Sequence, residues 1–380
     1  MILEHQLAQQ IVDRTMNIIG NNINVMNHAG IIIGSGDAHR IGHLHDGALL
    51  AIKHGDTVEL SEETCQTLKG AKPGINLLLK NQGNVIGVVG ITGDPDTIRS
   101  YANLVKMTAE MIVEQAALTE QLQWDKRHKE EFITAWISNN LNEAELHNWA
   151  SRLNIDLNKP RVATVIEFLS GSRDVSLQDI RQVVDILEYP YRDNLVAVVS
   201  MNEVVVLKPY KKEDVEGFRQ SESERIDKLI ERLHASGIFD VHVGLGKYFA
   251  EPKKIHLSYQ SAKQVIQFGK KNMPDSNKHL FDSNQLPVLL SPLANNWQGE
   301  QLCEPIVKLN ANDKSGQLIK TLITLFKCDG NLKKCANSLF IHRNTLRYRL
   351  NKVEEITKIS PHTFAGLVEL YIAIQINKSS

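Results

Sequence analysis

Residues 96–159 contain neither glycine nor proline, which strongly restricts what this part of the chain can fold into. Over its first half, one set of residues recurs at alternating spacings of four and three. That 3.5-residue period is typical of a helix with a coiled-coil seam along one face. The pattern predicts a single long helix over residues 96–136. The seam would contain Leu104, Thr108, Met111, Gln115, Leu118 and Leu122, and its phase continues through Asp125 and Lys129 to Phe132 and Trp136.

Two interpretations of this seam stay open. An interrupted seam on a helix that leaves a sensor domain suggests a dimeric signalling helix. Thr108 and Gln115 would weaken such a seam, as a switch between two arrangements of similar energy requires. The alternative is that the helix packs on its own domain. Three heptads are the minimum length for predicting a coiled coil, so the period leaves both interpretations open.

The residues before this helix mix helical and strand patterns. Their order predicts helix, hairpin, helix, hairpin and then the long helix. Such an order suits a small sheet that cups a ligand against its helices, as in PAS-like sensor domains. The predicted strands are residues 23–26, 31–33, 75–80 and 85–92, and the helix between the hairpins covers residues 42–54.

Strands and helices alternate in the middle of the chain, between residues 159 and 281. This alternation around a hairpin predicts an α+β sheet with helices on one face. The predicted strands are residues 161–168, 195–200, 204–208 and 241–245, and the predicted helices are residues 176–189, 221–236 and 253–270.

The last region is helical from about residue 286, and residues 331–358 predict two short helices separated by a tight turn. Asn331 is a suitable N-cap for the first helix. Leu332, Cys335, Ala336 and Leu339 share one apolar face, and Leu346, Leu350 and Val353 resume the pattern after the turn. This is the layout of a helix-turn-helix, whose second helix enters the DNA major groove.

Positive charge is concentrated in the same segment. Residues 331–358 hold seven Lys or Arg and two acidic residues, although the whole chain has a formal charge of −1. Arginine can bond guanine edges and asparagine adenine edges in a bidentate way. We therefore predict base contacts from Arg343, Asn344, Thr345 and Arg347, and mostly phosphate contacts from Lys333, Lys334, Arg349 and Lys352. The alternative is a solvated basic helix in an ordinary helical domain.

Composition sets broad limits. A chain of 380 residues suggests two or three domains, with 42% hydrophobic and 23% charged residues as in ordinary globular proteins. No apolar run is long enough to span a bilayer and no secretory signal is visible, so we expect no membrane partner. The four scattered cysteines fit free thiols in a reducing cytoplasm.

Three regions of the chain carry a resemblance to a known family. LFIHRNTLRYRLNKVEEITK closely resembles the helix-turn-helix of the PucR group of bacterial transcription activators. AQQIVDRTMNIIGNNINVM and GDAHRIGHLHDGALL resemble the sugar-diacid recognition domain of the carbohydrate diacid regulators. The middle hairpin and SYQSAKQVIQFGK resemble the degenerate GGDEF-like domain of the same family.

The resemblance covers essentially the whole chain and implies a cytoplasmic, effector-responsive activator. It would respond to glucarate, galactarate or glycerate and control genes for their uptake and breakdown. Its expected partners are double-stranded operator DNA, a small dicarboxylate or hydroxy acid, RNA polymerase and further copies of itself, and no cofactor is expected. We predict an α+β multidomain chain with a PAS-like sensor at residues 1–95, a signalling helix at 96–140, a degenerate GGDEF-like domain at 141–285 and an all-α helix-turn-helix domain at 286–380.

A sugar diacid is a small dianion with several hydroxyls, and its binding needs a cation, free N–H groups and polar side chains. Arg40 supplies the cation, and a helix that begins near Gly42 would supply N–H groups. The turn at residues 72–76 could line the other side. The predicted effector site is Arg40, Ile41, Gly42, His45, Gly47, Gly74 and Asn76.

The histidines of this segment have two other interpretations. His39 and His43 are four residues apart, a spacing that places metal ligands together on a helix, although no partner motif accompanies them. They could also be plain surface histidines.

Two other functional classes remain as rivals. A nucleotide cyclase of GGDEF type needs a glycine-rich hairpin tip and nearby acids, but here residues 200–204 lack the glycines and keep one acid. We therefore predict that the chain is not an enzyme, with a cyclase-like or diacid-metabolising enzyme as the alternative. The third possibility is an interaction module whose basic helix meets an acidic protein.

Overall fold

The computed structural model describes residues 3–68, 71–169, 175–189, 193–210 and 215–379. The chain divides into two compact units, residues 1–127 and 128–380, each with its own hydrophobic core. This division falls inside the predicted signalling segment, 96–140. The bounds of the four segments proposed from the sequence remain predictions.

The first unit is built on a five-stranded antiparallel sheet with the order β2-β1-β5-β4-β3. Both predicted hairpins are confirmed. The short strand β3 and the short helix α3 were not predicted. The strands are β1 Ile23–Asn27, β2 Ile32–Ser35, β3 Val58–Leu60, β4 Gly74–Asn81 and β5 Asn84–Thr92.

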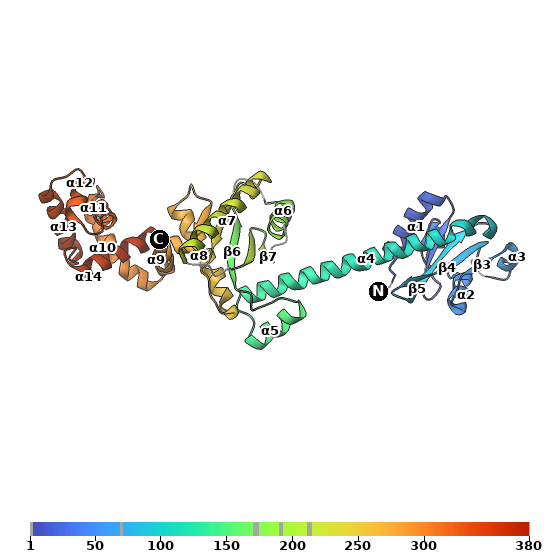
Figure 1. The fold of residues 1–380 in the computed structure, drawn as a ribbon. Helices are drawn as coiled ribbons and strands as arrows, with labels where there is room; N and C mark the ends of the chain where they lie inside the picture. Colours follow the sequence, from blue (N-terminus) through green and yellow to red (C-terminus); the bar gives the residue numbers. More distant parts are fainter. Residues whose placement is uncertain (1–2, 69–70, 170–174, 190–192, 211–214, 380) are drawn as a thin grey trace. The chain divides into compact units, whose positions relative to one another are not determined.

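Helices cover both faces of this sheet (Figure 1). Alternate residues of β4 point to opposite faces, as strand geometry requires. Ile75, Leu77 and Leu79 pack in a core with α1 and α4, whereas Leu78 packs in a second core with α2. Asn76 therefore faces α2. The helical segments of the unit are α1 His5–Ile19, the 3₁₀ turn η1 Ala38–Arg40, α2 Asp46–His54, α3 Glu62–Cys65 and the first part of α4 Pro95–Ile137.

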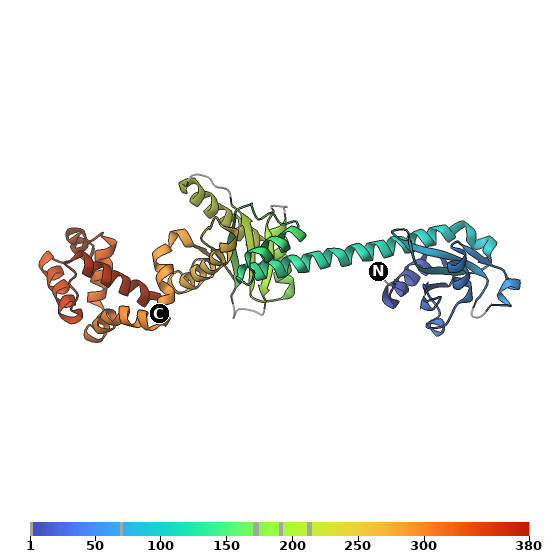
Figure 2. The ribbon, with the colours of Figure 1, turned by 90° about the horizontal axis from the view of Figure 1, so that it is seen from below.

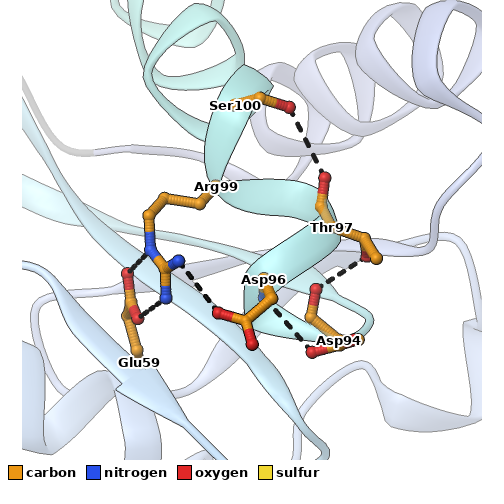
Figure 3. Close-up of polar contacts among 6 residues, drawn as sticks. All are labelled: Glu59, Asp94, Asp96, Thr97, Arg99 and Ser100. Atoms are coloured by element: carbon orange, nitrogen blue, oxygen red, sulfur yellow. Dashed lines mark hydrogen bonds and ion pairs between the residues drawn. The ribbon is translucent and has the colours of Figure 1, made fainter.

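The long helix α4 confirms the prediction of one helix over residues 96–136. Asp94 closes its first turn, since its Oδ1 accepts from the Asp96 amide at 3.2 Å and its carbonyl accepts from the Thr97 hydroxyl at 2.8 Å (Figure 3). One face of α4 is buried on the sheet through Ile98, Ala102, Val105, Ala109, Ile112 and Val113. The helix thus packs on its own domain, but through residues outside the predicted seam.

The seam does not continue to the end of α4. Phe132 and Trp136 are 0% and 4% exposed in the core of the second unit, and the rings of Phe132 and Trp149 lie 5.7 Å apart. These two residues therefore have no surface left for a partner helix, and the seam that stays exposed ends at Leu122.

The second unit contains a sheet of the order β10-β9-β6-β8-β7, in which β10 is parallel to β9 and the other pairs are antiparallel. Its α+β character and its predicted elements are confirmed. The described elements are β6 Arg161–Phe168, α6 Leu177–Glu188, β7 Leu195–Ser200, β8 Glu203–Pro209, α7 Val215–Ala235, β9 Val241–Leu245, α8 Ile255–Asn272 and β10 Lys278–Leu280, preceded by α5 Glu143–Arg152.

The prediction of helices on one face of this sheet is wrong. α6 and α7 pack on one face, and α8, α5 and the end of α4 pack on the other. The reason lies in the strands: residues 161–166 of β6 and 203–208 of β8 are buried without interruption. Strands buried on both faces have continuous apolar runs rather than alternation.

The C-terminal part of the second unit is helical, as predicted, and is drawn in orange to red in Figures 1 and 2. Leu322, Leu346, Leu350 and Leu370 belong to its core. Within the residues that the structure describes, no helix meets the length and apolarity needed to cross a bilayer. The helices are α9 Gln285–Leu290, α10 Trp297–Asn312, α11 Gln317–Lys327, α12 Leu332–Ser338, α13 Arg343–Thr357 and α14 Phe364–Ser379, with the 3₁₀ turns η3 Phe281–Ser283 before α9 and η4 Ser291–Asn295 after it. A further 3₁₀ turn, η2 Pro252–Lys254, precedes α8.

Candidate effector and nucleic-acid sites

The helix α2 begins at Asp46, four residues later than the sequence predicts. The segment before it contains a turn at Ile41 and Gly42 and is hydrogen-bonded to the chain around β2. The Gly42 amide donates to the Ile32 carbonyl at 2.8 Å, and the His45 amide donates to the Gly30 carbonyl at 2.9 Å. The amide of Gly42 is therefore used internally. The N–H groups that lack an i−4 acceptor belong instead to Asp46 and the residues after it.

His45 is the N-cap of α2. Its Nδ1 accepts from the Ala48 amide at 3.2 Å, and its ring is buried. Burial, followed by the positive charge of Arg40, lowers the pKa of His45 to about 4. The ring is therefore neutral near pH 7, and because Nδ1 is an acceptor, the proton is assigned to Nε2. Nε2 can then donate to a carboxylate.

Gly47 is the point where two polar side chains converge. A Cβ at this position would lie 3.0 Å from Asn76 Nδ2 and 3.0 Å from His45 Cε1, and 2.6 Å from Leu60 Cδ1. Asn76 is 2% exposed, and its Oδ1 finds no hydrogen-bond partner among the described residues. A buried acceptor left unpaired is costly, so this amide is suited to receive a donor such as a ligand hydroxyl.

Arg40 ends the 3₁₀ turn η1, whose first amides are held by Asp37: its Oδ1 accepts from the His39 amide at 3.2 Å. Burial lowers the pKa of Arg40, and the nearby Asp37 carboxylate raises it. An arginine remains charged under these conditions. Since Arg40 also depresses the pKa of His45, the two side chains belong to one electrostatic environment.

The other predicted effector residues have different surroundings. Ile41 is half-buried, and Gly42 is exposed with a φ of +84° and open space around it. A Cβ at Gly74 would lie 2.1 Å from the Ile91 carbonyl oxygen, so strand packing alone explains this glycine. The structure thus brings His45 and Asn76 together at Gly47 and places Arg40 near His45, whereas Gly74 lies in the sheet two residues from Asn76.

A buried polar row on the same sheet face was not predicted. Ser35 pairs with Asn24, and both Asn24 and Asn76 pair with Gly90 between them. The Ser35 hydroxyl donates to Asn24 Oδ1 at 2.7 Å, and all three polar side chains are buried. In the sequence they alternate with apolar residues and resemble a solvated strand face. The sequence signal for this row was the presence of two asparagines, Asn24 and Asn76, on strands whose face is covered by a helix.

The metal interpretation of the histidines depended on a helical spacing that is wrong, because His39 and His43 lie on no shared helix and both are exposed. Among the described residues, no three His, Cys, Asp or Glu side chains are grouped to hold a metal.

A separate hollow of about 310 Å³ lies at the tips of the hairpins in the first unit. Among the described residues that line it are Asn27, His28, Asn81 and Gln82, and none is arginine or lysine. It therefore lacks the permanent cation that a dicarboxylate needs, and the group around Gly47 is the better candidate.

The helix-turn-helix is confirmed. Asn331 Oδ1 accepts from the Lys334 amide at 3.0 Å and caps α12 as predicted, and His342 Nδ1 accepts from the Asn344 amide at 3.3 Å and caps α13. Phe340 makes the turn with a φ of +55°. Ala336 is buried together with Leu346, which allows the two helices to pack closely.

The predicted base-reading residues lie in the first turns of α13, and all of them are exposed: Arg343, Asn344, Thr345 and Arg347. Lys333 and Lys334 are exposed on α12. Two exposed aromatic residues of the helix-turn-helix were not among the predicted DNA contacts. Tyr348 is 68% exposed on α13, and Phe340 is 95% exposed at the turn. An aromatic residue between two arginines was the available signal for Tyr348.

Arg349 differs from the other cations of α13. Its guanidinium donates to Gln317 Oε1 at 2.6 Å and to Thr321 Oγ1 at 3.3 Å on α11. This contact holds α13 on its supporting helix and competes with the predicted phosphate contact. Lys352 forms an ion pair with Glu355 at 2.9 Å, which raises its pKa.

The hairpin tip of the middle domain also has an internal role. Glu203, its only acid, is buried, accepts a hydrogen bond from the Tyr259 hydroxyl and pairs with Lys263 at 2.9 Å. Burial and the Glu203 contact raise the pKa of Tyr259 to about 12. The carboxylate that a cyclase would use to bind Mg²⁺ is therefore already bonded to Tyr259 and Lys263.

Comparisons with known proteins give a consistent result along the chain. The family model for sugar diacid recognition matches residues 3–136, that for a GGDEF-like domain residues 138–268, and that for the PucR C-terminal helix-turn-helix domain residues 318–376. The chain is 41% identical over 382 residues to the Carbohydrate diacid regulator of Escherichia coli (strain K12), covering 99% of this chain and 98% of that protein. The chain belongs to the carbohydrate diacid regulator family.

Other relatives are similar over most of their length. An uncharacterized protein of Haemophilus influenzae (strain ATCC 51907 / DSM 11121 / KW20 / Rd) is 38% identical and covers 98% of both chains. The Proline-responsive transcriptional activator PutR of Bacillus subtilis (strain 168) is 23% identical over 79% of this chain and 74% of its own. The family membership and the helix-turn-helix make this chain a DNA-binding transcriptional regulator with a domain of the sugar diacid recognition family.

Proposed function

We propose that this chain is an effector-responsive activator of genes for the uptake and breakdown of sugar diacids. The effector would be glucarate, galactarate, glycerate or a close relative. Family membership supports the regulatory role, and similarity to the Carbohydrate diacid regulator of Escherichia coli supports the diacid class.

The observation that carries the effector proposal is the convergence of His45 and Asn76 at Gly47, with Arg40 near enough to His45 for its charge to lower the pKa of that ring. Arg40 would pair with one carboxylate, since guanidinium matches carboxylate geometry. The Nε2–H of His45 and the first amides of α2 would donate to the same or the second carboxylate. Asn76 Oδ1 would accept from a ligand hydroxyl. Each requirement of a hydroxylated dianion thus has a matching group.

For DNA, we propose that α13 lies in the major groove. Arg343, Asn344, Thr345 and Arg347 would contact bases, whereas Lys333, Lys334 and Lys352 would contact phosphates. Arg349 would mainly position α13, because it is bonded to α11.

Several further parts of the proposal are supported less directly. The small sheet with helices on both faces supports a PAS-like sensor, and the Glu203 network supports a structural relay in the middle domain. An activator must act beside DNA and RNA polymerase, so we propose a cytoplasmic location, a contact with polymerase and a homo-oligomer on DNA. No cofactor is part of the proposal.

A thermal-shift screen tests the effector class. The full chain should be stabilised by glucarate, galactarate or glycerate, since a ligand that binds only the folded state raises the melting temperature. Succinate, which lacks hydroxyls, should have a smaller effect. Equal shifts with every acid, or none with any hydroxylated acid, would contradict the proposal.

The enzyme alternative has a simple test. A cyclase would turn over GTP in the presence of Mg²⁺. Because Glu203 is bonded to Tyr259 and Lys263, we expect no product. Steady turnover that disappears in a Glu203→Gln variant would support the enzyme instead.

A further inference from the structure

An apolar row is exposed along α4 on a face that the chain itself does not cover in the described residues. Large apolar side chains rarely remain exposed in contiguous rows unless they meet a partner. The buried face of the same helix runs through Val105 and Ile112, so the exposed row is a separate surface. Its apolar members and their exposed fractions are Leu104 52%, Met107 54%, Met111 59%, Leu118 57% and Leu122 60%.

The spacing of this row indicates which kind of partner it binds. Leu104, Met111 and Leu118 are seven residues apart and take the d position of a heptad, while Thr108, Gln115 and Leu122 take the a position. Leucine at d is typical of two-stranded parallel coiled coils, and a polar residue at one a position specifies register and oligomer state. In a parallel pair, each seam residue meets its own copy, so a second copy of this chain matches the seam along its whole length.

Charge on the flanks agrees with that arrangement. In a parallel pair, the residue at g on one helix faces the residue at e of the next heptad on the other. Glu114 would face Thr119, and Gln121 would face Lys126, so neither pair combines like charges. The exposed seam ends before Asp125, and Phe132 and Trp136 are buried within the second unit. The boundaries of the contact are therefore Leu104 and Leu122.

We infer that residues 104–122 of α4 form a parallel, in-register coiled coil with a second copy of this chain. The contact is short and contains polar layers at Thr108 and Gln115, so it is moderately stable and can respond to its surroundings. Dimeric helix-turn-helix proteins read two half-sites, so this contact also doubles the DNA surface. The inference depends on α4 and stands whether or not the effector is a diacid.

Disulfide cross-linking in the full chain tests the contact. Leu118→Cys places a thiol at a d position, where parallel chains bring identical residues together. Gln123→Cys places one on an exposed position of the same helix turned away from the seam. Mild oxidation should link L118C into a covalent dimer, whereas Q123C should link no more than the wild type, whose own four cysteines set the background.

Sedimentation velocity gives an independent readout. The wild type should be dimeric at micromolar concentration, and Leu118→Lys combined with Leu122→Lys should shift it to monomer, while Gln123→Lys should not. Gln115→Leu should tighten the dimer about tenfold or more. A monomeric wild type, no L118C cross-link, or a dimer that survives the paired lysines would overturn the inference. If L118C and Q123C cross-link to the same extent while the protein still dimerises, the dimer forms through another interface and the inference is wrong.

Discussion

The guanidinium of Arg99, in the second turn of α4, forms a bidentate ion pair with the carboxylate of Glu59 in β3. Its Nε donates to Oε1 at 2.9 Å, and its Nη2 donates to Oε2 at 2.7 Å (Figure 3). The remaining Nη1 donates to Asp96 at 2.9 Å. These bonds raise the pKa of Arg99, and its hydrogen bond lowers the pKa of Glu59. The start of the long helix is thereby bonded to β3, the edge strand of the sheet in the first unit.

That strand also contacts the candidate effector site. Val58 pairs with Asn76, and the Leu60 side chain lies against Gly47. We expect Arg99→Gln to leave diacid affinity unchanged but to reduce the effect of the diacid on DNA binding, because this ion pair links the site to α4. Calorimetry and gel shifts with and without diacid would measure the two quantities. The variant Glu59→Gln should likewise keep its diacid affinity and show a reduced effect of the diacid on DNA binding.

A charge exchange provides the control for this coupling. The double variant Glu59→Arg with Arg99→Glu rebuilds an ion pair between the same positions and should recover part of the diacid response. If Arg99→Gln responds to diacid like the wild type, the ion pair has no role in coupling.

Gly47→Ala should block the effector site. The new methyl would lie within 3.0 Å of both His45 and Asn76 and closer still to Leu60. Overpacking of this kind costs about 1–3 kcal/mol, and we expect diacid affinity to fall about tenfold or more, equal to ~1.4 kcal/mol. Calorimetry on this variant, with Lys53→Ala in the last turn of α2 as the control, checks the prediction. Wild-type affinity in Gly47→Ala would show that the ligand binds elsewhere.

The first unit should lose stability as the pH falls from about 6.5 to about 4. The pKa of His45 is about 4 in the folded chain and near 6.5 when unfolded, so the unfolded state binds the proton first in this range. A protonated Nδ1 also cannot accept from the Ala48 amide. The hydrogen-exchange protection factors of residues 46–54, which correct for the slower intrinsic exchange at low pH, should therefore fall on acidification. His45→Asn keeps a cap without titrating, and an equally steep acid response in that variant would exclude His45 as the cause.

Arg347 and Arg349 should separate DNA contact from helix positioning. Arg347→Ala should weaken binding to a cognate site by about 1–3 kcal/mol and relax specificity, with no change in stability. Arg349→Ala should destabilise the α11–α13 packing by about 1–2 kcal/mol, because it removes charged hydrogen bonds to Gln317 and Thr321.

Hydrogen exchange of α13 and salt-dependent gel shifts would distinguish these two roles. Arg349→Lys keeps the charge without the two-donor fork and should resemble Arg349→Ala in exchange. If Arg349 contacts a phosphate instead, exchange will be unchanged and the salt slope will fall by about one.

The long helix and the helix-turn-helix could be predicted from the sequence because each has a sustained apolar period and, at Asn331, a recognisable cap. The 3.5-residue period of α4 could not show that Ile98 and Val105 provide a buried face, or that Phe132 and Trp136 are buried in the second unit. β3 has only three residues, too few for any period.

The surroundings of the candidate effector site were predicted only in part. Arg40, His45 and Asn76 were named, but the helix start was placed at Gly42 because residues 41–45 have no local feature that reveals their bonds to Gly30 and Ile32. Asn24 and Ser35 reach the same sheet face as Asn76 through strand register, which depends on pairing between distant segments. The role of Arg349 likewise depends on its contact with another helix.

The most direct measurement of the central claim is calorimetry of diacid binding to the full-length Arg40→Ala variant, paired with a gel shift on promoter DNA. Removing the cation should abolish detectable binding of the stabilising diacid and the diacid response, while DNA binding without effector stays at the wild-type level. Lys53→Ala should match the wild type in both assays. Wild-type diacid affinity in Arg40→Ala would contradict the account.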